Sequence, residues 1–192
     1  MAFSIDQLVA DCIDAAEEAG GHAGVAVEEV LARTISDPAA IEAAIGHPRD
    51  QPVLAAWFTS NELSVLHVVW PPGVDLLPHD HLMWAAIGLY GGREDNRVFR
   101  SLADGTLEHR RTKTLLPRDT ILLGDDTVHA VANPSREWTG AIHVYGGDFF
   151  RSGKRMWSDP GRPGAPFDFD LLRRVLNDAA NAAKELEARR YV

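Results

Sequence analysis

From residue 52 to residue 150 the chain is a succession of short runs rich in β-branched and aromatic residues, separated by glycine, proline and aspartate. Runs that recur at intervals of about 8–12 residues are typical of a β-sandwich or a β-barrel, because each run suits one strand and each separator suits a turn. Asp104 and Gly105 predict a hairpin between strands at 97–102 and 106–113, since this dipeptide tolerates the positive φ angles of a type I′ turn. We therefore expect a mainly β structure in the middle of the chain.

Helical patterns precede this β region. Residues 4–19 carry one apolar stripe and begin with Ser4 and Gln7, which are spaced as a capping box. Further helices are expected at 25–34 and at 38–45, the latter because proline suits a first helical turn. The N-terminal quarter is therefore expected to be helical.

A helix is also expected after the β region. It follows a proline- and glycine-rich passage, and either Asp168 or Asp170 is suited to cap it. Its predicted buried stripe consists of Leu171, Leu172, Val175, Leu176, Ala179, Ala183 and Leu186.

The length of 192 residues, with 45% hydrophobic residues, suits one substantial core. We expect a single domain, 1–192, with a helical part at 1–50, a barrel at 51–150, and a loop and closing helix at 151–192. The net charge of −9 argues against nucleic acid as a partner. Cys12 is the only cysteine, and neither a leader pattern nor a membrane-length apolar run is found, so a cytoplasmic protein without a membrane partner is expected.

Four histidines of the β region are notable for their spacing. His79 and His81 occupy alternate positions of one expected strand, so both imidazoles point into the same space. His129 follows in a later strand, and in the strand at 141–145 alternation places His143 and Tyr145 on one face. Because imidazole is both a common metal ligand and a common polar core group, the pair of histidines alone leaves both roles open.

The whole arrangement resembles the two-motif metal signature of the cupin superfamily. Gly73, then His79 and His81, then His129 followed by Asn133, all lie among short strands. The resemblance implies a double-stranded β-helix, which is a small jelly-roll barrel. It also implies that the three histidines are metal ligands. With the flanking helices, the expected fold is a cupin barrel with N-terminal helices and a C-terminal helix.

A departure from the common cupin pattern narrows the resemblance. Most metal cupins carry a glutamate shortly after the second histidine, where this chain has Ala85 and Ala86. Three histidines without that glutamate, followed by His143 and Tyr145, resemble the thiol dioxygenases, whose best known member is cysteine dioxygenase. The resemblance implies Fe(II), O2 and a small thiol substrate. It also implies that Tyr145 and His143 are catalytic residues beside the metal, although Ala141 replaces a serine that often completes this group.

The substrate is expected to differ from cysteine. In cysteine dioxygenase an arginine on the strand before Leu63 holds the carboxylate of the amino acid, and residues 53–58 contain no arginine. Bidentate recognition by a guanidinium group is not reproduced by other side chains. Arg93, Arg97 and Arg100 could take over by their nearness to the histidine motif, but each also suits a solvated strand end.

Two alternatives to a dioxygenase stay open. Three neutral imidazoles leave the full charge of a divalent metal to be neutralised by an anionic substrate such as a thiolate, which suits Fe(II) and O2 chemistry. The same ligands bind Zn(II), Ni(II) or another divalent metal, which would suit an isomerase or hydrolase. A cupin that binds a small molecule without catalysis is the other alternative. The sequence does not distinguish a monomer from a homodimer.

Overall fold

The computed structural model describes residues 2–189. Its helices are α1 (Ile5–Ala19), the short 3₁₀ turn η1 (Gly20–His22), α2 (Ala23–Thr34), α3 (Pro38–Ile45) and α4 (Phe169–Ala188). Its strands are β1 (Val53–Thr59), β2 (Ser64–Trp70), β3 (His79–Asp80), β4 (Ala85–Gly91), β5 (Glu94–Ser101), β6 (Leu107–Leu115), β7 (Thr120–Leu123), β8 (Val128–Ala132), β9 (Thr139–Tyr145), β10 (Arg155–Met156) and β11 (Ala165–Pro166).

Strands β2 to β9 form a double-stranded β-helix. One sheet contains β2, β9, β4 and β7 in that order, the other contains β3, β8, β5 and β6, and neighbouring strands are antiparallel. The chain thus passes back and forth between two facing sheets, as in a jelly roll built from two Greek keys. Strand β1 extends the first sheet, and β10 and β11 extend the second.

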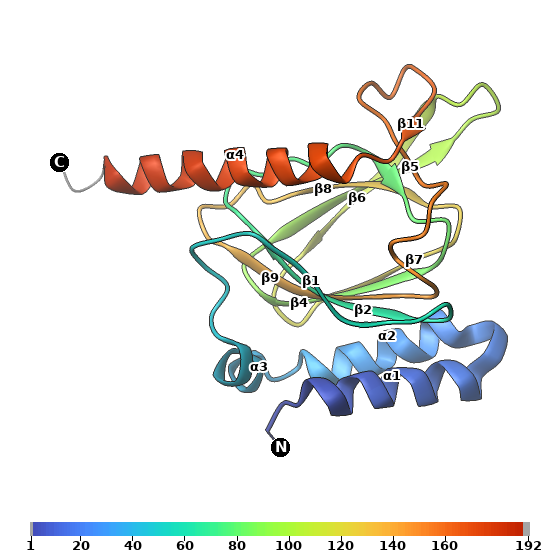
Figure 1. Ribbon diagram of the computed structural model, residues 1–192, viewed down its shortest axis with the longest axis vertical. Helices are drawn as coiled ribbons and strands as arrows, with labels where there is room; N and C mark the ends of the chain where they lie inside the picture. The colour runs from blue at the N-terminus through green and yellow to red at the C-terminus, as the bar shows by residue number, and fades with distance from the viewer. Residues whose placement is uncertain (1, 190–192) are drawn as a thin grey trace.

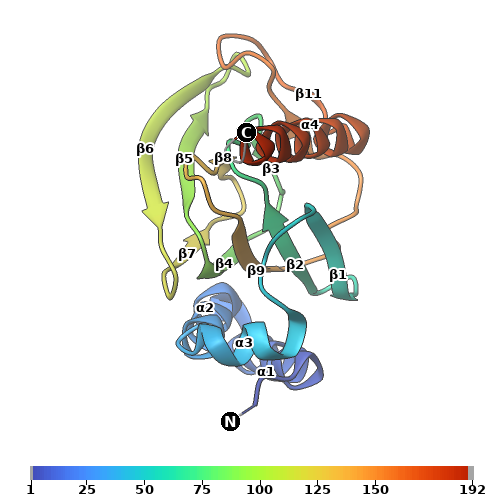
Figure 2. The same ribbon diagram turned by 90° about the vertical axis from the view of Figure 1, so that its left-hand side faces the viewer.

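The helices lie on opposite sides of this barrel. Figure 1 shows α1, α2 and α3 against one sheet and α4 across the other side, and the perpendicular view in Figure 2 agrees. The fold predicted from the sequence, a jelly-roll barrel with helices at both ends, is confirmed. Within residues 2–189, every helix is too short or too polar to cross a bilayer.

The middle strands of the first sheet are buried on both faces. On β2 and β4, Leu66 and Ile87 face the opposite sheet, whereas Val65 and Ala86 pack with the N-terminal helices. Both faces therefore require apolar side chains, which explains why these strands appear in the sequence as continuous apolar runs rather than alternating ones. Cys12 lies in the helical layer, and burial raises the pKa of its thiol to about 12, as expected for a packed and unreactive cysteine.

The helix ends differ in detail from the prediction. The hydroxyl of Ser4 accepts a hydrogen bond from the Gln7 amide (3.4 Å), but the Gln7 side chain donates to Asp11 (2.7 Å), so only half of the capping box forms. Asp168 rather than Asp170 caps α4. The prediction that Leu186 is buried is wrong, because α4 extends beyond the barrel at this end and Leu186 is 66% exposed.

The hairpin between β5 and β6 forms as predicted, but its turn does not. The Leu102 amide donates to the Thr106 carbonyl (2.8 Å), which closes a loop of residues 103–105, and the Gly105 amide donates to the Leu102 carbonyl (2.9 Å). Only Gly105 has a positive φ, 81°, whereas a type I′ turn needs two such residues. The glycine thus serves a longer loop with one left-handed residue.

Candidate metal centre

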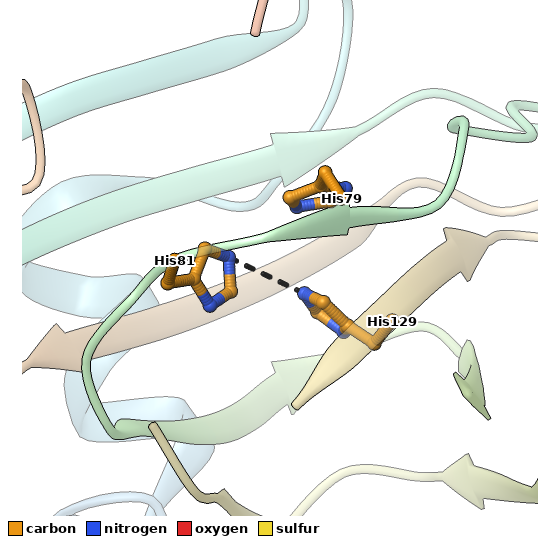
Figure 3. A group of neighbouring side chains, drawn as sticks. All are labelled: His79, His81 and His129. Atoms are coloured by element: carbon orange, nitrogen blue, oxygen red, sulfur yellow. Dashed lines mark hydrogen bonds between the residues drawn. The ribbon is translucent and has the colours of Figure 1, made fainter. Parts of the chain in front are cut away.

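The three histidines predicted as ligands lie together. Pairing of β3 with β8 sets His79 directly opposite His129, and His81 follows at the end of β3. One ligand nitrogen of each lies within 4.8 Å of the others, and the Nε2 atoms of His81 and His129 are 3.4 Å apart. Figure 3 shows the rings of His79 and His81, from β3 and the residue after it, close to the ring of His129 on β8.

The arrangement fits one divalent metal ion. With metal–nitrogen bonds of about 2.1 Å, neighbouring imidazole nitrogens lie roughly 3.0–3.4 Å apart, as those of His81 and His129 do. The Nδ1 of His79 donates to the Leu77 carbonyl (2.9 Å) and that of His129 donates to Oδ1 of Asn96 (2.8 Å). These bonds fix the tautomer in which Nε2 has a free lone pair, as is usual for metal-bound histidine. Nε2 of His81 can donate to Nε2 of His129 across the 3.4 Å between them, or can join it as a second ligand when a metal is bound.

All three imidazoles are held in the neutral form that binds a metal. Burial lowers the pKa of His79 to about 4 and those of His81 and His129 well below their usual value. The nearby ammonium group of Lys154 acts in the same direction on His79 and His81. At neutral pH the site is therefore uncharged and can accept a divalent cation without losing protons first.

A small apolar cavity adjoins the histidines. Its volume is about 20 Å³, which is room for about one water molecule. Besides the three histidines, His143 and Tyr145, its wall consists of Leu54, Trp70, Leu76, Val131, Phe149, Phe167 and Leu172. Of the residues that the structure describes, no arginine or lysine lines it. The wall itself therefore supplies no cationic partner for a carboxylate, although the Lys154 ammonium lies over the wall's Phe149 and Phe167 rings, 4.0 Å and 5.0 Å from their centroids.

His143 and Tyr145 enter the same cavity from the other sheet. The Nδ1 of His143 is 3.0 Å from the Tyr145 hydroxyl, and the Tyr145 ring packs edge-on against His81 with centroids 4.9 Å apart. Burial lowers the pKa of His143 to about 3 and raises that of Tyr145. Both groups are therefore neutral, and the tyrosine keeps its proton. The structure brings together all five residues singled out from the sequence.

No family model matches the sequence. The order of the strands in the two facing sheets, β2-β9-β4-β7 and β3-β8-β5-β6, identifies the type of barrel. The barrel has the cupin fold. Among solved structures, an RmlC-like cupin family protein from Methanocaldococcus jannaschii matches 53% of this chain and 84% of its own, with 10% identity and a TM-score of 0.45. The DMSP lyase DddQ from Ruegeria pomeroyi matches 55% of this chain and 51% of its own, with 16% identity and a TM-score of 0.45. Likenesses of this size say nothing about the activity of the chain.

One buried acid of the cupin barrel, Glu94, was missed at the sequence level. It is fully buried at the start of β5, where one carboxyl oxygen accepts from Nε1 of Trp70 (2.8 Å) and the other accepts from Nδ2 of Asn96 (2.8 Å). Burial raises the pKa of Glu94 to about 7. A polar run such as residues 93–97 normally lies at the surface, so the only sequence signal was that alternate positions of a strand, 94 and 96, share a face.

The other candidates from the sequence do not reach the cavity. Arg93 pairs with Asp95 (3.0 Å), and Arg97 pairs with Asp75, so both guanidinium groups have partners outside it. Arg100 pairs with a carboxylate of β6. The three arginines therefore have carboxylate partners rather than a role in the cavity.

Proposed function

We propose that the protein is a mononuclear non-haem Fe(II) dioxygenase that inserts O2 into a small thiol other than cysteine. The observation that carries the proposal is the set of three neutral histidines around one point, two of them buried and His79 half-buried, with Tyr145 lining the same cavity. Three neutral ligands leave a net charge of +2, which favours an anionic ligand such as a thiolate. Three facial ligands also leave three positions of an octahedron open, enough for the substrate and O2 to coordinate together.

The residues of the site would have different roles in this reaction. His79, His81 and His129 would hold Fe(II), which acidifies a bound thiol and exchanges electrons with O2. Leu77 and Asn96 orient two of the imidazoles through their Nδ1 protons. The apolar wall excludes water. The Tyr145 hydroxyl is placed to donate a hydrogen bond to negative charge that develops on the reacting substrate.

The cavity wall also limits the substrate. A buried carboxylate without a cationic partner is costly, so a substrate that carries one next to its thiol is disfavoured. A larger groove of about 460 Å³, lined mostly by apolar side chains but also by Arg173 and Asn177, shares Leu54 and Leu172 with the cavity. The groove runs along α4, so these two side chains separate it from the metal ligands. Because the cavity holds only about one water molecule, a small thiol with an apolar remainder would bind only where Leu54 and Leu172 move and join the two spaces.

The test combines metal analysis with oxygen uptake. Protein produced without added metal should contain iron in about equal amount to the chain, and a panel of small thiols should include one that consumes O2. His79→Ala should lose iron and activity but keep its fold, whereas His109→Ala is the matched control because His109 is exposed on β6. Iron-loaded protein that consumes no O2 with any thiol would contradict the proposal.

A non-redox metal enzyme is the second candidate. The 3.4 Å between the Nε2 atoms of His81 and His129 also suits a tetrahedral Zn(II) site. A hydrolase or isomerase of this kind would be fully active with Zn(II) under anaerobic conditions. An Fe(II) dioxygenase would not be.

A further inference from the structure

Glu94 has no cationic partner, although it is fully buried. Its two carboxyl oxygens accept one hydrogen bond each, from the Trp70 indole and from the Asn96 amide, both of which are neutral. The ionised form has about four lone-pair positions to satisfy and carries a charge that burial disfavours. The protonated form needs only one further contact, an acceptor for its proton.

That acceptor lies on β9. The Nε2 atom of His143 is buried and has no hydrogen-bond partner among residues 2–189. It is 4.0 Å from Oε2 of Glu94, about 1 Å more than a hydrogen bond, so a hydrogen bond between them requires a shift of about that size in one of the two side chains. The other ring nitrogen of His143 already contacts the Tyr145 hydroxyl at 3.0 Å. Glu94, His143 and Tyr145 therefore form a row that ends in the metal cavity.

The protonation of Glu94 decides the direction of the hydrogen bonds in this row. When Glu94 is protonated, it donates to Nε2 of His143, Nδ1 carries the ring proton and donates to the Tyr145 oxygen, and the tyrosine proton is free to point into the cavity. When Glu94 is ionised, Nε2 carries the ring proton and Nδ1 accepts from Tyr145, which then offers only lone pairs to the cavity. The two arrangements differ by one proton, which is exchanged with solvent.

We propose that Glu94 is a positioning residue that, when protonated, selects the His143 tautomer and so makes the Tyr145 hydroxyl a donor toward the substrate. This inference rests on the proposed function and extends it to the residue that orients the hydroxyl. The other carboxyl oxygen of Glu94, Oε1, accepts from Nδ2 of Asn96 whether Glu94 is protonated or ionised. Oδ1 of Asn96 therefore accepts from Nδ1 of His129 in both cases. Metal binding should therefore not follow the protonation of Glu94.

The surroundings of Glu94 support a change of state near neutral pH. Its pKa is raised to about 7 by burial, against the hydrogen bonds from Trp70 and Asn96. On its own strand, Asp95 raises the pKa further but is itself paired with Arg93. On β6, apolar Leu115 lies opposite Glu94.

The remaining titratable groups of the row do not change charge in this range. On β9, burial lowers the pKa of His143 to about 3 and raises that of Tyr145, so both stay neutral. On β8, burial also keeps His129, beyond Asn96, neutral. A change of tautomer without a change of charge is therefore expected at His143.

The test needs a variant that donates permanently. In Glu94→Gln the new amide would face the Trp70 N–H, donor against donor, so we combine it with Trp70→Phe. In that double variant the glutamine oxygen still accepts from Asn96 and its NH₂ donates to His143. Trp70→Phe alone is the matched control, because it keeps the carboxyl group and loses a hydrogen bond that lowers its pKa.

The readout is ¹⁵N NMR of the histidine rings in full-length, metal-free protein, which does not depend on turnover. In the wild type the His143 proton should move from Nδ1 to Nε2 as the pH rises through about 7, and in Trp70→Phe the change should occur at higher pH. In the double variant the proton should stay on Nδ1. A single His143 tautomer throughout in the wild type, or a change that persists in the double variant, overturns the proposal.

Wild-type infrared spectra provide a second measurement that needs no variant to fold. A buried carboxylic acid band that disappears as the pH rises through about 7 supports the proposal, and its absence at all pH values overturns it. Failure of the proposed function would leave both spectra as expected but would show no O2 uptake. The two claims can therefore fail separately.

Discussion

The buried carboxyl group of Glu94 should make the stability of the protein depend on pH in an unusual direction. Its pKa rises from 4.5 in the unfolded chain to about 7 in the fold. Between these pH values the folded protein holds a proton that the unfolded chain has released, so the free energy of unfolding falls as the pH rises. At about 1.4 kcal/mol for each pH unit, the loss is about 3 kcal/mol and is complete above about pH 7.

The assay is urea unfolding of metal-free protein at several pH values, comparing Trp70→Phe with Trp70→Phe/Glu94→Gln. Both variants contain the same histidines, whose lowered pKa values make the free energy of unfolding rise with pH up to about pH 6.5. This contribution is the same in the two variants and cancels when their free energies are subtracted. Relative to the double variant, Trp70→Phe should lose about 3 kcal/mol between pH 4.5 and 7.5, or somewhat more because the loss of the Trp70 hydrogen bond lets its carboxyl hold the proton to higher pH. A difference that stays constant within roughly 0.5 kcal/mol would refute the assignment of a raised pKa to Glu94.

Three further predictions concern the metal site and its substrate. Tyr145→Phe removes only the hydroxyl, so iron content should be unchanged while turnover falls roughly a hundredfold; lost iron, or unchanged turnover, would contradict the role of Tyr145. Asn96→Ala removes the acceptor of the His129 Nδ1 proton, so a titration should show that the affinity of the protein for Zn(II) falls by roughly 10–100-fold. An affinity equal to that of the wild type would contradict this role of Asn96. Cysteine should support oxygen uptake orders of magnitude more slowly than a small thiol without a carboxylate, because no cation lines the described cavity, and comparable rates would show that a cation reaches it.

Local sequence patterns predicted the fold well because they follow directly from burial. Strands buried on both faces require continuous apolar runs, and helices on one face of a sheet require a stripe, so the order of elements could be derived before the structure. The exceptions depend on distant geometry. Whether Leu186 meets the barrel depends on how far α4 extends past the sheets, and the turn at Gly105 depends on the register of β5 and β6.

The candidate site was predictable only in part, for a related reason. Alternation along a strand places two side chains on one face, which was enough for His79 with His81 and for His143 with Tyr145. The resemblance to cupins supplied His129. The shared face of Glu94 and Asn96 on β5 was too weak a signal, because the other contacts of Glu94 come from β2 and β9 and the polar residues next to it lie partly at the surface. A buried acid at the end of a polar run can be recognised only when the sheets are assembled.

The central claim is that His79, His81 and His129 hold one iron ion. X-ray absorption at the iron edge of the protein as purified tests it most directly, with His81→Ala for comparison. We predict three imidazole nitrogens at about 2.1 Å in the wild type and no bound iron in the variant. Iron held mainly by carboxylate oxygens, or an unchanged iron site in His81→Ala, would contradict the assignment.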